Sequence, residues 1–141
     1  MSYDLMVFEK AAAPKNRKDF LEWYHKQTEW SEEHDYNNPT ETSDNLRSFF
    51  MELIKKYPPM NGPFALNDDE IAKMKNEAYL TDYSIGRVVI YAAFAQSVSA
   101  QAYKAVRQLA RKHDVGLFTA SYIDDGKIIF SDKEIISTKE K

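Results

Sequence analysis

Apolar residues recur along this chain at spacings that predict strands in some segments and helices in others. The most apolar segment covers residues 81–95, and no charged residue occurs between Arg87 and Gln96. Its Val, Ile, Tyr and Phe side chains favour a strand. Because this strand offers no polar face, we expect it in the middle of a sheet, with both faces covered and helices on at least one.

The residues before that strand leave two arrangements open. Residues 79–85 have the pattern of a further strand, and Gly86 follows directly. Gly86 is either the turn of a β-hairpin, which gives two antiparallel strands, or a bulge within one long bent strand. Three more strands are expected, at residues 3–9, 117–123 and 127–131.

One segment carries the clearest helical pattern, an apolar stripe at i, i+3, i+4, i+7, i+8 and i+11. The stripe consists of Leu46, Phe49, Phe50, Leu53, Ile54 and Tyr57. Ser43 or Asp44 caps the start of this helix, and the prolines at 58 and 59 end it. The charged residues 67–78 that follow form either a short surface helix or a long loop.

Two further helices are expected. One covers residues 16–33, with Asn16 as its N-cap. The other begins after a cap at Ser97 or Ser99 and ends before Gly116, since glycine is the usual residue just past a helix C-terminus.

The predicted order is strand, helix, helix, one or two strands, helix, strand, strand. This order indicates the α/β class, an α+β two-layer sandwich. A ferredoxin-like split β-α-β arrangement with an extra helix in the first crossover fits best, with four to five strands and three to four helices. We expect a single domain over residues 1–141, with a frayed tail at 132–141.

Composition narrows the class of protein. The net charge of −3 at pH 7 argues against a dedicated nucleic-acid-binding protein, which usually carries a basic excess. The absence of cysteine excludes disulfides, thiol nucleophiles and cysteine metal sites. The sequence has neither a signal-peptide pattern nor an apolar run of about 18 residues. We therefore expect a cytoplasmic protein with no membrane or nucleic-acid partner.

No pattern of catalytic residues stands out. The serines lie outside any Gly-x-Ser-x-Gly elbow, and with four glycines in the chain a phosphate-binding loop is improbable. Glu22 and His25 have the spacing of half a carboxylate metal site, but no second matching motif occurs. We therefore predict no catalytic residues, no cofactor and no metal site.

An aromatic and acidic segment is the first candidate for binding. If one helix continues to residue 33, Trp23 and Trp30 share a face of it. Tryptophan and tyrosine dominate interface hot spots, although they are also common in cores. The predicted interaction surface consists of Trp23, Trp30, Glu29, Glu32, Glu33, His34 and Tyr36.

A second candidate is a pocket where polar groups meet the edge of the core, near the start of the apolar strand. A buried aspartate there would need hydrogen-bond partners and could have a perturbed pKa, although a structural capping role is the simpler explanation. The predicted pocket residues are Asp82, Tyr83, Arg87 and Tyr91.

A basic ridge on the last predicted helix is the third candidate. Lys104, Arg107 and Arg111 follow helical spacing, and Lys112 is adjacent. Three cations on one face can bind an acidic protein surface or a phosphate. The alternative is an ordinary solvated helix face.

Several segments resemble a family of small uncharacterised bacterial proteins. They are Ser2-Tyr-Asp-Leu, the region around Trp23 and Trp30, Pro-Pro-Met-Asn-Gly-Pro at 58–63, Thr-Asp-Tyr-Ser-Ile-Gly at 81–86 and Val-Ile-Tyr-Ala-Ala-Phe at 89–94. Since that family has no established activity, the resemblance implies no site residues. In size, acidity and lack of cysteine the chain is also similar to immunity proteins, which neutralise a cognate toxin.

The leading hypothesis from the sequence is a non-enzymatic protein-interaction domain, of which an immunity-type inhibitor of a basic toxin or nuclease is one form. The alternative is a small-molecule binding domain or minor enzyme with its pocket near Asp82, Tyr83 and Arg87. A deep pocket favours the alternative, and an exposed aromatic and acidic patch favours the interaction domain.

Overall fold

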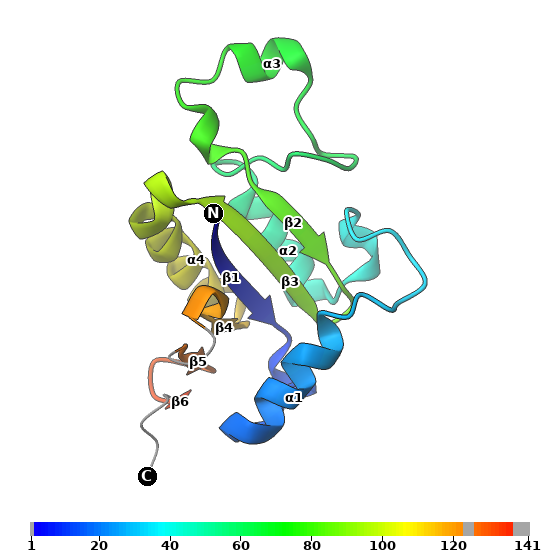
Figure 1. The fold of residues 1–141 in the computed structure, drawn as a ribbon, viewed down its shortest axis with the longest axis vertical. Coiled ribbons are helices and arrows are strands. Elements are labelled where there is room, and N and C mark those ends of the chain that lie inside the picture. Colours follow the sequence, from blue (N-terminus) through cyan, green and yellow to red (C-terminus); the bar gives the residue numbers. More distant parts are fainter. Residues whose placement is uncertain (1, 123–125, 137–141) are drawn as a thin grey trace.

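A computed structural model describes residues 2–122 and 126–136. The described residues form a six-stranded antiparallel sheet in the order β2-β3-β1-β4-β5-β6 (Figure 1). The strands are β1 (Ser2–Phe8), β2 (Asp82–Ile85), β3 (Val89–Ala95), β4 (Gly116–Phe118), β5 (Ile128–Ile129) and β6 (Ile135–Ile136). The inner order β4-β1-β3-β2 is that of a ferredoxin-like sheet, which confirms the predicted fold class with one more strand than expected.

Helices cover the two faces of the sheet unequally. The helices are α1 (Arg17–Gln27), α2 (Asp44–Leu53), α3 (Asp68–Ala72) and α4 (Ser99–His113). The pair α2 and α4 lies behind the sheet in Figure 1, and α1 lies in front of its lower part. α1 is the extra helix of the first crossover.

Alternation along β1 divides the core into two clusters. Tyr3, Leu5 and Val7 pack toward α2 and α4, whereas Met6 and Phe8 pack toward α1. All five side chains are buried, because each face of the strand meets a helix there. β1 therefore holds the two layers together.

Strand β3 differs from the sequence expectation on its second face. Ile90, Ala92 and Phe94 are buried against α2 and α4, but Tyr91 and Ala93 are only half-buried. The expectation that both faces are covered is thus wrong over the upper part of the strand. The reason is that α1 is too short to reach it.

The β2–β3 connection resolves the first open alternative. Ile85 pairs with Ile90, and the Gly86 amide donates to the Val89 carbonyl oxygen at 2.8 Å. The two strands are antiparallel neighbours in register, so Gly86 opens a hairpin connection and is not a bulge within one strand.

Helix α1 ends earlier than predicted. Its N-cap is Asn16, whose side chain accepts from the Asp19 amide, but the helix stops at Gln27 and not at residue 33. Trp30 has a φ of +54°, which no α-helix can contain. Acidic side chains after residue 28 would also oppose the macrodipole if the helix continued.

The other helices match their patterns apart from the ends. Ser43 is the N-cap of α2, which stops at Leu53, four residues before Tyr57. The undecided segment 67–78 contains the short helix α3, which has a capping box between Asn67 and Glu70. α3 and the chain around it extend beyond the end of the sheet (Figure 1).

At the end of α4 the left-handed residue is Asp114, with φ +56°, and not Gly116. Gly116 instead begins β4 and lies under the ring of Phe8. A Cβ at position 116 would stand 2.2 Å from Phe8 Cε2 and Cζ. Glycine is required there for close packing and not for a helix cap.

The C-terminal strands are shorter than predicted. β4 ends at Phe118 and is followed by a 3₁₀ turn over Ala120–Tyr122. β5 has two residues, and β6 pairs with it inside the range expected to be a frayed tail. Residues 123–125 and 137–141, on which the rest of these expectations fall, lie outside the described residues.

Gly116→Ala tests the close approach of β4 to Phe8. The Phe8 ring cannot retreat, because it stacks edge-on against Phe20 at 5.1 Å and against Phe130 at 5.2 Å. We expect the variant to lose about 1–3 kcal/mol of unfolding free energy in chemical denaturation, the usual cost of overpacking.

The matched control is Gly86→Ala, whose added Cβ would meet its nearest neighbours at 3.4 Å, an ordinary contact. Its loss should stay below about 1 kcal/mol. Equal losses for both variants would contradict the packing role of Gly116.

Candidate functional site

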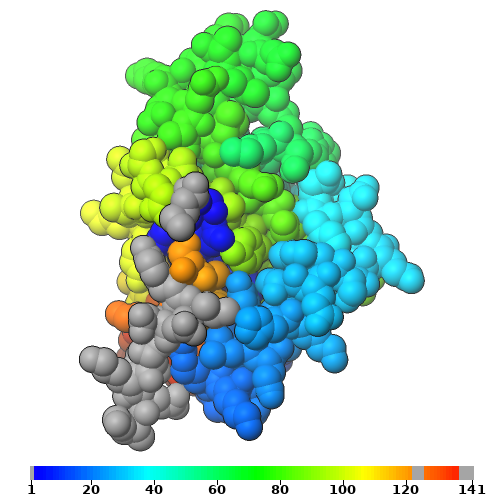
Figure 2. Space-filling model, in the orientation of Figure 1, coloured from blue at the N-terminus to red at the C-terminus, as the bar shows by residue number. Residues whose placement is uncertain are grey.

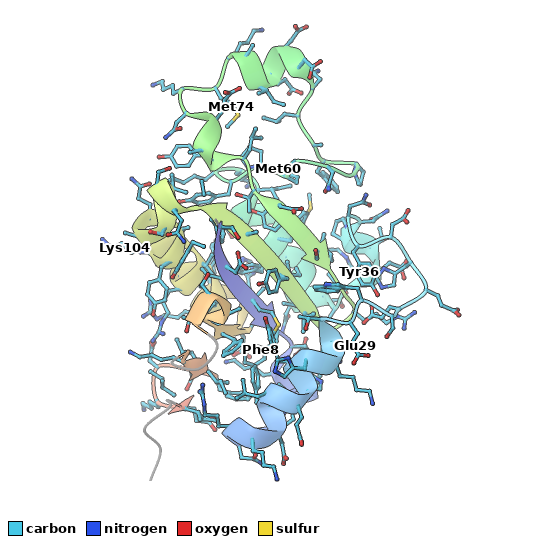
Figure 3. The ribbon with its side chains drawn as sticks, viewed as in Figure 1. Phe8, Glu29, Tyr36, Met60, Met74 and Lys104 are labelled. Carbon is cyan, nitrogen blue, oxygen red and sulfur yellow. The ribbon has the colours of Figure 1, made fainter. Side chains whose placement is uncertain are left out.

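The uncovered part of the sheet forms a hollow, which we call the open-face groove. It has a volume of about 300 Å³ and lies between the end of α1 and strands β2 and β3. Its lining consists of Tyr24, Thr28, Trp30, Asp82, Ser84, Tyr91 and Ala93. Figure 3 labels Glu29 and Tyr36 near its lower end, where the chain leaves α1.

Strand pairing places two carboxylates on either side of a small residue in this groove. Ala93 of β3 pairs with Asp4 of β1 on one side and with Asp82 of β2 on the other. Paired residues point to the same face of a sheet. Because neighbouring strands lie about 4.8 Å apart, the backbones of Asp4 and Asp82 are about 10 Å apart, with Ala93 as the floor between them.

The two carboxylates have different surroundings. Tyr91 Oη donates to Asp4 Oδ2 at 2.5 Å, and Ser2 Oγ donates to Asp4 Oδ1 at 2.5 Å. Asp82 is exposed and has no side-chain hydrogen bond or ion pair to any described residue. Asp4 is therefore a positioned acceptor, while Asp82 is open to an incoming donor.

Two tyrosines supply protonated hydroxyls to the groove. Burial raises the pKa of the Tyr91 hydroxyl, and its hydrogen bond to Asp4 raises the pKa further. Burial also raises the pKa of Tyr24, against a lowering by the neighbouring Tyr91 hydroxyl. Both phenols keep their protons at neutral pH, so the negative charge in this region resides on the carboxylates.

Trp30 closes the lower end of the groove. Its ring meets the rings of Tyr91 and Tyr36 edge-on, with centroids 6.3 Å and 5.1 Å away. A left-handed backbone is unusual for so large a residue and costs about 1–3 kcal/mol. Such strain persists where the surrounding structure enforces it. Here the strained backbone places the Trp30 indole in the lining of the groove.

A second hollow continues the open-face groove toward the far end of the sheet. It has a volume of about 420 Å³ and shares Asp82 and Ala93 with the first. Met60, Leu80 and Glu77 line its outer part. In Figure 2 the atoms of β2 and β3 reach the surface between α1 and the segment around α3, and Met60 is labelled near this end in Figure 3.

The loop after α1 is fastened to the β2–β3 hairpin. Glu32 Oε1 accepts from the Arg87 amide at 3.1 Å, and the Tyr36 carbonyl oxygen accepts from the Ile85 amide at 2.7 Å. Tyr36 Oη accepts from the Glu32 amide at 2.6 Å. These contacts fix the loop that carries Trp30, so the hairpin determines where the indole ring lies.

His34 completes this network through both of its ring nitrogens. Its Nε2 lies 2.5 Å from Glu32 Oε1 and its Nδ1 lies 2.9 Å from the Asp35 carbonyl oxygen. Both partners are acceptors, so both contacts are hydrogen bonds only in the imidazolium form, in which each ring nitrogen carries a proton. The bond to the Asp35 carbonyl raises the pKa of His34, burial lowers it, and the hydrogen bond and charge of Glu32 raise it.

The structure brings together part of each predicted set. Trp30 from the interaction surface lines the open-face groove together with Asp82 and Tyr91 from the predicted pocket. Glu32, His34 and Tyr36 fix the loop beside it, and Glu29 and Glu33 are exposed on the same loop. The aromatic and acidic surface and the polar pocket, separate in the sequence, are neighbours in space.

The remaining predicted residues lie elsewhere. Trp23 packs against Phe8 and Phe20 in the cluster under α1. Tyr83 is buried on the opposite face and donates to the Tyr57 carbonyl oxygen at 2.7 Å. Arg87 is exposed in the hairpin and is bound through its backbone.

Sequence reasoning missed several lining residues. No site role was predicted for Thr28, Ser84 or Ala93, which line the groove, or for Asp4, which lies beside Ala93. Alternation is the signal that could have found them, since Tyr91 and Ala93 share a face of β3 with period two. The pairing of β1 with β3, which brings in Asp4, is not visible in the sequence.

The basic ridge is largely paired. Arg107 and Arg111 contact Asp132, and Lys112 contacts Glu52, while Lys104 is exposed. The described residues contain no group of three or more His, Asp or Glu side chains arranged to hold a metal ion. None of the described helices has the length and apolarity needed to cross a bilayer.

Comparison of the chain with protein-family models, with curated proteins and with solved structures found no match. The candidate function therefore rests on the geometry described above.

His34 predicts a pH-dependent contribution to stability. Because its pKa is raised in the folded state, the contribution is complete below the unfolded value of about 6.5 and is lost as the pH rises through the folded value. We expect His34→Asn to cost about 1 kcal/mol at pH 5.5 and less at pH 8, measured by urea denaturation.

His25→Asn, at an exposed position of α1, is the control and should change stability equally little at both pH values. A His34→Asn loss that is the same at pH 5.5 and pH 8 would rule out the charged pair with Glu32.

Proposed function

We propose that this protein is a non-enzymatic interaction domain whose open-face groove binds a basic segment of a partner protein. The observation that carries the proposal is the composition of the groove. Three aromatic rings and an unpaired carboxylate line it, and none of the described residues that line either of its two hollows is Lys or Arg. Such a surface attracts cations and repels anions.

A lysine or arginine side chain fits the groove chemically. Its aliphatic part would lie over Ala93 and its charged end would meet Asp82, which has no described partner. The rings of Trp30 and Tyr91 offer faces for a cation–π contact. Asp4 adds a second negative charge from the other side of Ala93, already oriented by Tyr91.

The surroundings of the groove support a protein partner. Glu29, Glu33 and Asp35 are exposed on the loop next to Trp30 and would steer a basic protein toward it. Glu77 lines the continuation of the groove, so negative charge extends along an elongated site. Inhibition of a basic toxin or nuclease, as in immunity proteins, is one activity that such a surface would serve.

One observation favours a small-molecule ligand as the second candidate. The first hollow alone, at about 300 Å³, has the size of a small ligand site. The same carboxylates and rings would then bind a free organic cation. The elongated shape of the combined groove favours the protein segment.

Peptide binding tests the groove directly. The probe is acetyl-Gly-Arg-Gly-Arg-Gly amide, and the same peptide with citrulline in place of arginine is its uncharged counterpart. We expect the arginine peptide to shift the amide resonances of Ser84, Tyr91 and Ala93, and to bind more weakly at high salt. Asp82→Asn should weaken binding up to about fivefold, the worth of an exposed charge pair.

Asp69→Asn on α3 is the matched control, because it removes the same charge at an exposed position away from the groove. Binding that is equal for the citrulline peptide, or equally weakened by both substitutions, would contradict recognition of a cation in the groove. Tight binding of free arginine methyl ester, with no gain from the peptide, would favour the second candidate.

Trp30→Gly tests the aromatic contribution. Glycine adopts the left-handed backbone without cost, so the loop is preserved while the ring is lost. We expect the affinity for the arginine peptide, measured by calorimetry, to fall roughly three- to thirtyfold, the range of a cation–π contact.

Trp23→Phe is the control for this experiment, since Trp23 packs under α1 and does not line the groove. It should lower stability and leave the affinity unchanged. An unchanged affinity in Trp30→Gly would remove Trp30 from the site.

A further inference from the structure

A cavity separate from the open-face groove and its continuation lies at the opposite side of the sheet, between the end of α4 and strands β4 and β5. It has a volume of about 240 Å³, equal to the liquid volume of about eight water molecules. Part of its wall is apolar and formed by Ala110, Val115, Leu117 and Ile129, each 5% exposed or less. Such walls suit a short apolar chain or ring.

Two guanidinium groups meet at the mouth of this cavity. Arg107 Nη2 lies 3.0 Å from Asp132 Oδ1, and Arg111 Nε lies 2.9 Å from both Asp132 oxygens. Arg107 is 16% exposed, whereas Asp132 is 57% exposed. Arg111 is 50% exposed, so Arg107 belongs to the wall, and Arg111 and Asp132 meet it from the solvent side.

Asp132 comes from a different part of the fold than the arginines. It lies in the short connection between β5 and β6, a turn in which the Phe130 amide donates to the Glu134 carbonyl oxygen at 2.8 Å. The turn closes through its own backbone, so it does not depend on the Asp132 side chain. The carboxylate can leave the arginines without unfolding the turn.

The charges around the cavity differ in sign from those of the whole protein. Lys10 pairs with Asp114 at 2.6 Å, both residues being part of the lining, and the two arginines share one carboxylate. The lining therefore carries a net charge of +1, in a protein whose net charge is −3. This positive lining attracts an added anion.

We propose that this cavity binds a small carboxylic acid with an apolar tail, whose carboxylate takes the place of Asp132 between Arg107 and Arg111. The tail would occupy the space beside Val115 and Leu117, two of the buried apolar side chains of the lining. Two arginines bind a carboxylate more strongly than a neutral group of equal size. The expected ligand is therefore a carboxylic acid and not an alcohol or an amide. The site shares no residue with the open-face groove and does not depend on the proposed function.

Three probes separate the parts of this ligand. Hexanoate has both charge and tail, 1-hexanol has the tail alone, and acetate has the charge alone. In a titration followed by amide resonances of the full-length protein, hexanoate should shift Ala110, Val115 and Leu117 and bind at least about tenfold more tightly than either other probe. Equal binding of 1-hexanol, or no shift of these resonances by hexanoate, would overturn the proposal.

Asp132→Asn removes the internal competitor at an exposed position and should tighten hexanoate binding up to about fivefold. Arg107→Gln should weaken it about tenfold or more. Lys104→Gln, exposed on the same helix and outside the cavity, is the control and should change nothing.

Asp132→Asn keeps the experiment decisive if Arg107→Gln fails to fold, because Asp132 is itself exposed and an asparagine oxygen can still accept from the arginines. Hexanoate binding that is unchanged or weakened in Asp132→Asn would overturn the displacement of Asp132.

Discussion

The antiparallel pairing of β1 with β3 over seven residues, from Ser2 opposite Ala95 to Phe8 opposite Val89, is the constraint on which the rest of the structure depends. A shift of one residue in this pairing would move every side chain to the other face. Leu5 would then leave the α2–α4 layer, and Phe8 would leave the space under α1 that Gly116 keeps open. The same register places Asp4 beside Ala93, so the core and the candidate site are set by one set of hydrogen bonds.

The open-face groove is a consequence of how little of the second face α1 covers. Phe20 and Tyr24 bury Met6, Phe8 and Phe118, and the helix ends at Gln27. The chain then turns through Trp30 and is held to the hairpin by Glu32 and Tyr36. A longer helix would cover Tyr91 and Ala93, but it would lose this attachment to the β2–β3 hairpin.

The sequence was sufficient for the order of elements and for the main packing stripe, because both depend on local periodicity. Leu46, Phe49, Phe50 and Leu53 are buried as their spacing predicts. The sequence was insufficient for features of one segment that depend on contacts with a distant segment. The apolar run at 88–95 indicates a strand but not which neighbour covers it, so its half-open face was unexpected.

The same limit applies to the candidate site. Asp82 and Tyr91 were predicted in one pocket and Trp30 in a separate interaction surface, and only the fold makes the two neighbours. Tyr83 was grouped with Asp82 because it is adjacent in sequence, but adjacent residues of a strand point to opposite faces. The left-handed backbone of Trp30 is imposed by the loop contacts and has no local signal, since glycine or asparagine would be the expected residue there.

The two proposed sites have opposite charge, and the sheet keeps them apart. The open-face groove belongs to β2 and β3, and the cavity belongs to β4, β5 and α4, with β1 between them in the sheet order. β1 is paired on both sides, along its whole length with β3 and over Met6 to Phe8 with β4. A displacement of β1 along the sheet would break hydrogen bonds to both neighbours, so neither ligand is expected to shift its register. The groove should therefore bind its cationic ligand independently of the anionic ligand in the cavity. Any influence of one ligand on the other would have to act through electrostatics and not through movement of the sheet.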